Sequence, residues 1–372
     1  MAVMKLLAVT ITLTVAACAY DARFNDCAIS CSAATGCPSG LSCGSEGLCR
    51  TPGLVAACST LPDAAPPSDP PSCSGLAATC GLNANDDCCS TAMPIPGGTF
   101  YRGYDVAADS MYPDMSYPAT VSAFRLDKYE VTVGRFRAFV DAGMGIQASA
   151  PAMDAGARTL NGMASQGGWN ASWNVSLSAD TITLKANVKC DSTYQTWTDT
   201  VSIDDNRPMN CVTWYEAMAF CIWDGGFLPT EVEWNFAAAG GDEQRAYPWS
   251  SPASSTTIDC SYANYDINIP SGTYCINGTT GATNRVGSES PKGDGKWGQS
   301  DLAGNVYEWT LDKYVSPYDN PCNDCADLTP APYRVIRGGY TLTGAPYLRT
   351  ADRRVETPTI TAALVGVRCA RM

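Results

Sequence analysis

The chain has 372 residues, 45% of them hydrophobic and 16% charged, so it can bury one large core or two ordinary ones. Its formal net charge of −13 argues against an extended basic surface, and nucleic acid is therefore not an expected partner. The chain contains no histidine, which excludes serine–histidine triads, HExxH zinc sites and histidine-ligated iron, and leaves carboxylates, Tyr, Lys, Ser, Thr and Cys for any chemistry.

The first 17 residues indicate an export signal. Lys5 precedes an apolar stretch at residues 6–17 that is too short to span a bilayer as a mature helix. The sequence VAAC at residues 15–18 is typical of a bacterial lipobox, which predicts that Cys18 becomes the lipidated first residue of the mature protein. An ordinary signal-peptide cleavage site is the alternative. We therefore expect an exported cell-envelope lipoprotein, periplasmic or at the cell surface, anchored to the membrane by its lipid.

Cysteines divide the chain into regions. Without Cys18 the 19 cysteines leave an even number, as disulfide pairing in an oxidising compartment predicts. Residues 18–58 form a Gly/Ser-rich segment that we expect to be a disulfide-rich module, with a metal cluster as the alternative; its further cysteines are Cys27, Cys31, Cys37, Cys43, Cys49 and Cys58. Residues 59–72 form a Pro-rich linker, residues 73–93 a cysteine-containing lead-in, and residues 94–372 the main domain. The adjacent Cys88 and Cys89 of the lead-in are expected to pair with different partners.

Three helices are predicted in the main domain. Thr132 can cap a helix that ends near Ala142, because apolar residues recur at helical spacing and Gly143 follows. Two further helices begin at Thr-x-x-Glu capping boxes and end at Gly-Gly pairs, within residues 213–226 and 230–241. Short strands are expected at residues 124–131, 333–336 and 363–369, and a long insertion of loops and short strands at residues 144–200.

Seven short phrases follow one another between residues 94 and 371: PGGTF, DKYEVT, CVTW, LPTEVEW, GNVYEW, RGG and GVRC. In this order they resemble the formylglycine-generating (sulfatase-modifying factor) family. The resemblance implies an α+β fold, the family's variant of the C-type-lectin-like type, with few helices, small sheets and much ordered loop. The first 93 residues lie outside the resemblance.

The resemblance also implies a disulfide between Cys221 and Cys369, which in the loop-entropy view stabilises the fold by roughly 4–5 kcal/mol. We expect the remaining pairs of the main domain to be Cys190–Cys211, Cys260–Cys275 and Cys322–Cys325. The last of these has CxxC spacing and could be a redox pair, but no thioredoxin-like βαβ pattern surrounds it, which favours a small structural ring.

Calcium is the cofactor that the resemblance implies. Family members bind it through the Gly-Asn-x-x-Glu-Trp segment, whose matching ligands are the side chains of Asn305 and Glu308 and the carbonyl of Val306; loop carbonyls and water must complete the set of hard oxygen donors. The alternative is that Asn305 occupies a left-handed turn and Glu308 pairs with an arginine. A second family site matches Asn264-Tyr265, but its acidic ligand has no clear counterpart.

Two cysteines that the family's oxidases place between the RGG and GVRC phrases are missing. Those cysteines bind copper(I), a soft ion that selects thiolates, whereas residues 340–366 contain none. Copper and iron are therefore not expected, and no catalytic residue is assigned. We predict a non-oxidase binding or structural module for a peptide, glycan or protein ligand. The alternatives are an enzyme of divergent mechanism near Tyr340, Tyr347, Asp352 and Glu356, and a scaffold that acts through its N-terminal cysteine module.

Overall fold

The computed structural model describes residues 42–43, 49–50, 70–90, 92–107, 113–268, 272–276, 282–329 and 331–372. The chain divides into two compact units, residues 1–68 and residues 69–372. In the first unit, β1 (Ser42–Cys43) pairs antiparallel with β2 (Cys49–Arg50). The predicted signal segment, Cys18, most of the 18–58 module and the linker up to residue 69 lie outside the described residues.

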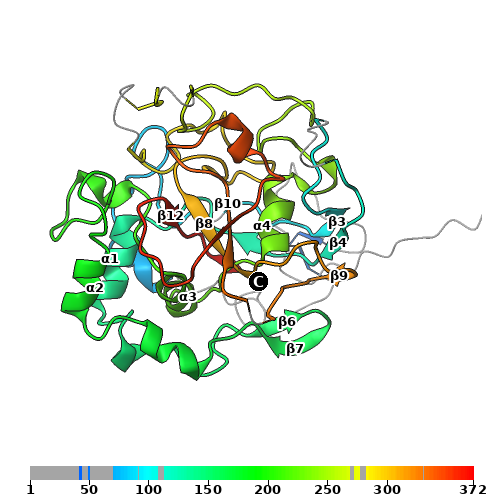
Figure 1. The fold of residues 1–372 in the computed structure, drawn as a ribbon. Helices are drawn as coiled ribbons and strands as arrows, with labels where there is room; N and C mark the ends of the chain where they lie inside the picture. The colour runs from blue at the N-terminus through cyan, green and yellow to red at the C-terminus, as the bar shows by residue number, and fades with distance from the viewer. Residues whose placement is uncertain are drawn as a thin grey trace, which may run out of the picture. The chain divides into compact units, whose positions relative to one another are not determined.

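A four-stranded sheet in the order β11–β10–β8–β12 forms the centre of the second unit (Figure 1). Its strands are β8 (Tyr307–Lys313), β10 (Arg334–Arg337), β11 (Arg354–Glu356) and β12 (Val365–Gly366). β10 is antiparallel to both β8 and β11, and β12 is parallel to β8. Because the sheet is covered on both faces, β8 is buried along its length except at its last residue.

Three helices begin at the caps that the sequence predicts. They are α1 (Val133–Asp141), α3 (Trp214–Trp223) and α4 (Glu231–Ala238). Thr132 accepts a hydrogen bond from the Arg135 N–H, and the Thr213 and Thr230 capping boxes are complete in both directions. A fourth helix, α2 (Thr181–Asn187), lies in the 144–200 insertion and was not predicted; Leu184 is its single buried residue, so it carries no apolar periodicity.

Alternate side chains of β8 serve opposite faces. Tyr307, Trp309 and Leu311 pack into the larger core with α1 and α3. On the other face, Glu308 accepts a hydrogen bond from the Trp234 indole of α4, and Asp312 accepts one from the backbone N–H of Glu231. A smaller core there joins α4 to β3 (Gly98–Tyr101) and β4 (Pro118–Val121), which lie beside α4 in Figure 1.

The remaining elements are short. β9 (Cys322–Asn323) extends the β3–β4 sheet, β5 (Arg125–Leu126) pairs with β13 (Ala370–Arg371), and β6 (Arg158–Leu160) pairs with β7 (Met163–Gln166). Short 3-10 helices occur at η2 (Pro71–Cys73), η3 (Gln147–Ser149), η4 (Ala171–Ser176), η5 (Ile203–Asn206), η6 (Gly241–Glu243) and η7 (Ala345–Leu348).

Two predicted strands are shorter than expected. Of residues 124–131 only Arg125–Leu126 are in a strand, because the next backbone N–H groups bond to two different segments: Asp127 and Val131 to Cys369 and Val367 near the C-terminus, and Lys128 to Ser90. Of residues 363–369 only Val365–Gly366 pair in the central sheet. The strand at 333–336 is confirmed within one residue as β10.

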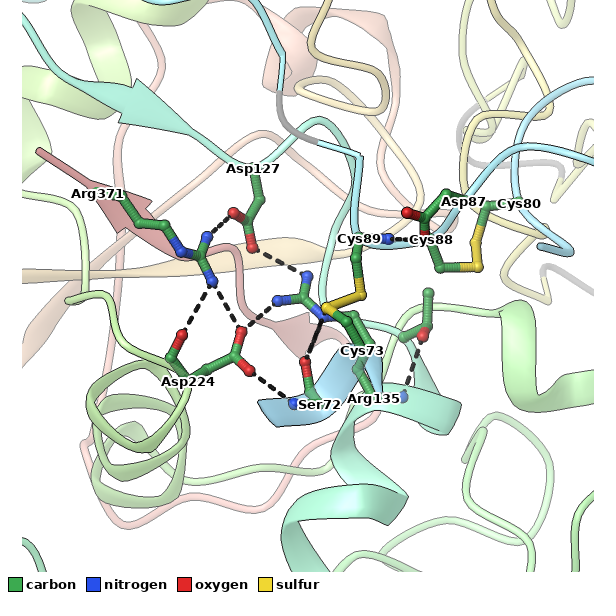
Figure 2. The surroundings of a disulfide bond; sticks show 11 residues. Ser72, Cys73, Cys80, Asp87, Cys88, Cys89, Asp127, Arg135, Asp224 and Arg371 are labelled. Carbon is green, nitrogen blue, oxygen red and sulfur yellow. Dashed lines mark hydrogen bonds and ion pairs between the residues drawn. A yellow bond between two sulfur atoms is a disulfide. The ribbon is translucent and has the colours of Figure 1, made fainter. Parts of the chain in front are cut away.

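The last residues of the expected linker, Ser72 among them, and the lead-in belong to the second unit, and Figure 2 shows their surroundings. Ser72 lies between Arg135 and Asp224: its backbone N–H donates to Asp224 and its hydroxyl accepts from the Arg135 guanidinium. Arg135 also pairs with Asp127 and Asp224, and all three side chains are at most 5% exposed. A buried arginine with two carboxylates is stable only when its hydrogen bonds are complete, and Ser72 completes this one.

Six disulfides lie among the described residues. Cys88 and Cys89 pair with Cys80 and Cys73, so the two adjacent cysteines do have different partners. The other pairs match those expected from the sequence: Cys190–Cys211, Cys221–Cys369, Cys260–Cys275 and Cys322–Cys325. This disulfide content is compatible with an exported protein. Within the described part of the chain, none of the helices has the length and apolar character needed to span a bilayer.

Candidate functional site

The segment that follows the RGG phrase lines a cavity. Tyr340, Thr341 and Leu342 follow β10 and form one wall of a space of about 340 Å³, which we call the Tyr340 cleft. Three other segments complete it. Its remaining lining residues are Cys190, Asp191, Tyr194, Thr283, Thr361, Ala362, Ala363 and Leu364.

Two glycines and the Asn305 loop position the Tyr340 wall. Gly338 and Gly339 have φ values of +101° and +76°, and a Cβ on Gly339 would lie 2.7 Å from the Leu348 side chain, so glycine is favoured at both positions of the RGG phrase. The Thr341 N–H donates to the Asn305 carbonyl, and the Tyr340 ring lies 5.5 Å from that of Tyr307. The wall is therefore fixed to the start of β8.

The opposite wall is fixed by a disulfide and an amide. Cys190–Cys211 anchors the turn in which Asp191 accepts hydrogen bonds from the Thr193 and Tyr194 N–H groups. The Asn210 side chain is fully buried and donates to the carbonyls of both Tyr194 and Ala363, which joins this wall to the base of the cleft. Sequence reasoning did not assign these residues to a site; the expected Cys190–Cys211 pair was the one available signal.

Hydroxyl groups dominate the chemistry of the Tyr340 cleft. Burial, with smaller effects from Tyr194 and Tyr274, raises the pKa of Tyr340, so its hydroxyl remains a hydrogen-bond donor at neutral pH. The Thr283 hydroxyl is buried and has no hydrogen-bond partner among the described residues. The single cysteine of the lining, Cys190, is oxidised, so the lining supplies no thiolate for a copper ion. These groups can bind a polar ligand by hydrogen bonding and by contact with aromatic rings.

Three of the residues named for a divergent enzyme do not line the cleft. Asp352 is 2% exposed and is paired with Arg354, whose guanidinium also lies over the Tyr347 ring at 4.4 Å. Glu356 accepts a hydrogen bond from the Thr357 N–H. The structure therefore brings only Tyr340 of this group to the cavity.

The predicted calcium residues lie behind the cleft in a buried polar cluster. Asn305 has a φ of +63°, and its side-chain oxygen accepts from the Asn284 N–H. Both carboxylate oxygens of Glu308 accept from the Arg368 guanidinium, and one also accepts from the Trp234 indole. The turn and the arginine pair of the alternative interpretation are therefore both present.

Three further carboxyls belong to this cluster and were not predicted. Glu130 accepts from the Asn305 amide and the Val306 N–H, and burial, followed by the charges of Asp301 and Glu308, raises its pKa well above the usual range. Burial also raises the pKa values of Asp301 and Glu289. Glu130 belongs to the DKYEVT phrase and Asp301 lies just before the GNVYEW phrase, whereas Glu289 lies in none of the seven phrases and has no signal of its own in the sequence.

The calcium prediction fits this cluster in part. Asn264 Oδ1 and Glu289 Oε2 are buried oxygens without a hydrogen-bond partner among the described residues, and such oxygens are hard donors of the kind that calcium prefers. Glu308 does not fit, since its oxygens are already held by a guanidinium and an indole. In the described part of the chain no three Cys, Asp or Glu side chains are grouped as a metal site. Calcium binding stays a prediction.

Comparison with known proteins gives a consistent result. The family model "Sulfatase-modifying factor enzyme 1-like domain" matches residues 82–372. The chain is similar to the formylglycine-generating enzyme of Thermomonospora curvata, at 30% identity over 309 residues, which is 75% of this chain and 92% of the relative. It is also similar to the inactive C-alpha-formylglycine-generating enzyme 2 of Bos taurus, at 32% identity over 174 residues, which is 44% of this chain and 52% of the relative.

A solved structure, that of PvdO from Pseudomonas aeruginosa, aligns with a TM-score of 0.49 at 19% identity, covering 75% of this chain and 92% of the other. The matched region begins at residue 82, so it includes the end of the lead-in that we had placed outside the resemblance. The elements of the structure confirm the α+β architecture of few helices and small sheets that the seven phrases predict, and the family model agrees with the resemblance from which it was expected.

Proposed function

Because this chain belongs to the sulfatase-modifying factor enzyme 1-like family, we propose that it keeps the family's fold as a non-oxidase module that binds a peptide or a glycan in the Tyr340 cleft. The observation that carries the proposal is the lining of that cleft. It supplies tyrosine and threonine hydroxyls, one aspartate and backbone groups, and its single cysteine is tied up in a disulfide.

The curated relatives include proteins named as enzymes and a protein named as inactive. One is named a formylglycine-generating enzyme and another an inactive counterpart. For this chain we infer the non-oxidase function from the missing thiols: a copper(I) site requires thiolates, and the segment from Tyr340 to Gly366 provides threonine and tyrosine oxygens instead. The alternative, an enzyme of divergent mechanism, has less support, because Tyr347, Asp352 and Glu356 are held elsewhere by Arg354 and Thr357.

Ligand binding tests the proposal directly. The purified chain is screened against a peptide library and a glycan array, and hits are measured by calorimetry with wild type and Tyr340→Ala. Because aromatic contact and the hydroxyl bond both disappear, we expect affinity to fall about tenfold or more. Tyr333→Ala is the matched control, since Tyr333 is 44% exposed and lies outside the cleft lining. Equal affinity for Tyr340→Ala and wild type would place the ligand elsewhere.

A second assay addresses the oxidase activity. The chain is incubated with copper and a sulfatase-type cysteine peptide, and the product is analysed by mass spectrometry for the aldehyde. We expect unchanged thiol. Aldehyde formation that depends on the added copper would overturn the non-oxidase proposal, whatever the binding screen gives.

Two further parts of the proposal concern calcium and the membrane. We propose that calcium binds in the cluster behind the cleft through the unpartnered oxygens of Asn264 and Glu289 and through the Asn305 loop, while Glu308 stays paired with Arg368.

We also propose that Cys18 carries a lipid that anchors the exported protein to the membrane. Labelling with a radioactive fatty acid tests this, with Cys18→Ser as the variant that should lose the label.

A further inference from the structure

The Cys322–Cys325 disulfide borders a second cavity, of about 390 Å³, which shares no lining residue with the Tyr340 cleft. Cys325 lines this cavity, whereas Cys322 does not. Cys325 is half-buried and Cys322 is only 5% exposed, because Cys322 belongs to strand β9 beside β4. A group that enters the cavity therefore reaches the sulfur of Cys325 first.

A buried cation faces the accessible sulfur. The Arg102 guanidinium, in a residue that is 6% exposed, donates from Nη1 to Cys325 Sγ at 3.4 Å. Its other acceptors are neutral oxygens, the Asp319 carbonyl and the Asn320 amide. Among the described residues no carboxylate lies within ion-pair distance of Arg102, although the charges of Glu231 and Asp312 act on it from farther away, so the sulfur is in direct contact with a cation that has no contacting counter-ion.

The carboxyls of the same cavity are held by other groups. Glu231 is ion-paired with both Arg337 and Arg353. Burial, followed by the charge of Glu231, raises the pKa of Asp312 to about 7, so Asp312 is partly protonated at neutral pH. Asp319 and Asp327 also line the cavity, and Asp327 accepts from the Thr329 N–H. None of these carboxyls contacts the sulfur directly, whereas Arg102 does.

The turn between the two cysteines is fixed independently of the disulfide. Asp324 has a φ of +45°, and its carboxylate accepts hydrogen bonds from the Ser122 N–H and hydroxyl. Asn161 donates its backbone N–H to the Asp324 carbonyl and accepts at its side chain from the Ala326 N–H. These bonds do not involve sulfur, so they can keep Cys322 and Cys325 together after reduction.

We propose that Cys322–Cys325 is a thiol–disulfide exchange site that oxidises a dithiol, in which Cys325 is the sulfur attacked and Arg102 is a positioning residue for its thiolate. A thiolate of the dithiol attacks Cys325 Sγ, the Cys322–Cys325 bond breaks, and Cys322 leaves as a thiolate that is then protonated. The second thiol of the dithiol then loses its proton and attacks the sulfur that the dithiol contributed to the mixed disulfide. This attack expels Cys325 as a thiolate beside Arg102. Two electrons pass from the dithiol to the protein, the dithiol becomes a disulfide, and its two protons end on solvent or on the cysteines.

Selective reduction tests the proposal. The full chain is equilibrated with increasing dithiothreitol, free thiols are alkylated, and peptides are identified by mass spectrometry. The Cys322–Cys325 bond should open first. Cys260–Cys275 is the matched control, because both of its cysteines are half-buried and no guanidinium among the described residues contacts either sulfur. Opening of Cys260–Cys275 before or together with Cys322–Cys325 would overturn the proposal.

The role of Arg102 is tested by a measurement that a general loss of stability would not change. The rate of Cys325 alkylation is measured against pH in the reduced chain, for wild type, Arg102→Lys and Arg102→Gln. In wild type the midpoint for Cys325 should lie below that for Cys322 and below the usual thiol value of about 8.5. Loss of the charge should raise it by about one pH unit, which is roughly a tenfold loss of thiolate at neutral pH, and lysine should restore most of the shift. A wild-type midpoint at or above 8.5 contradicts the proposal even where Arg102→Gln fails to fold.

Discussion

Replacing Glu308 by glutamine separates a structural role from a calcium-binding one. Glu308 and Arg368 have side chains 1% and 0% exposed and are joined by hydrogen bonds of 2.9, 3.1 and 3.2 Å. Glutamine keeps the size and one acceptor oxygen but leaves the buried guanidinium without the carboxylate that contacts it. Removing one partner of such a pair costs about 3–5 kcal/mol, and at about 2 °C per kcal/mol for a large domain Tm should fall by about 6–10 °C.

The measurement is thermal unfolding of wild type and Glu308→Gln, each in chelator and in calcium. Because Glu308 is ion-paired with Arg368, the difference in Tm between wild type and Glu308→Gln should be the same with chelator as with calcium. Glu356→Gln is the control; Glu356 is half-buried and forms no ion pair among the described residues, so its loss should remain within about 0.5 kcal/mol. The reasoning is refuted if Glu308→Gln unfolds at the wild-type temperature, or if it abolishes a calcium-induced rise in Tm.

Four further outcomes are expected. Replacing Cys221 and Cys369 by alanine opens a loop of sequence separation 148 and should lower the free energy of unfolding by at most about 5 kcal/mol, measured in denaturant. Asp312 has a folded pKa raised to about 7, so its contribution to stability is present below its ordinary pKa near 3.8 and is lost as pH rises towards 7; Asp312→Asn should flatten that part of the stability–pH curve. Asn210→Ala leaves the Tyr194 and Ala363 carbonyls without donors and should cost about 2–4 kcal/mol and weaken cleft binding. Calcium at one hundred times its dissociation constant should stabilise the chain by about 2.7 kcal/mol, whereas magnesium should do less, and no shift in Tm with calcium would remove the calcium proposal.

Local chemistry explains what could be predicted. Thr132, Thr213 and Thr230 satisfy the first N–H groups of their helices through bonds three residues away, so the starts of α1, α3 and α4 follow from the sequence. α2 was missed because it buries one residue, and the strand at 124–131 was overextended because its N–H groups bond to distant loops. The disulfide pairs were expected from family resemblance and position along the chain.

The sequence alone determined which reactive groups the protein lacks. A chain without histidine cannot place an imidazole at any site, and without cysteine from residue 340 to 366 it can place a thiolate beside the Tyr340 wall only from another segment. Only the tertiary structure decided which residues from other segments lie together. Cys190 lines the cleft but is bonded to Cys211. Glu308 pairs with Arg368, 60 residues away, and Arg102 contacts Cys325, 223 residues away. Such pairings depend on loops closed by long-range packing, and no local pattern of residues encodes their partners.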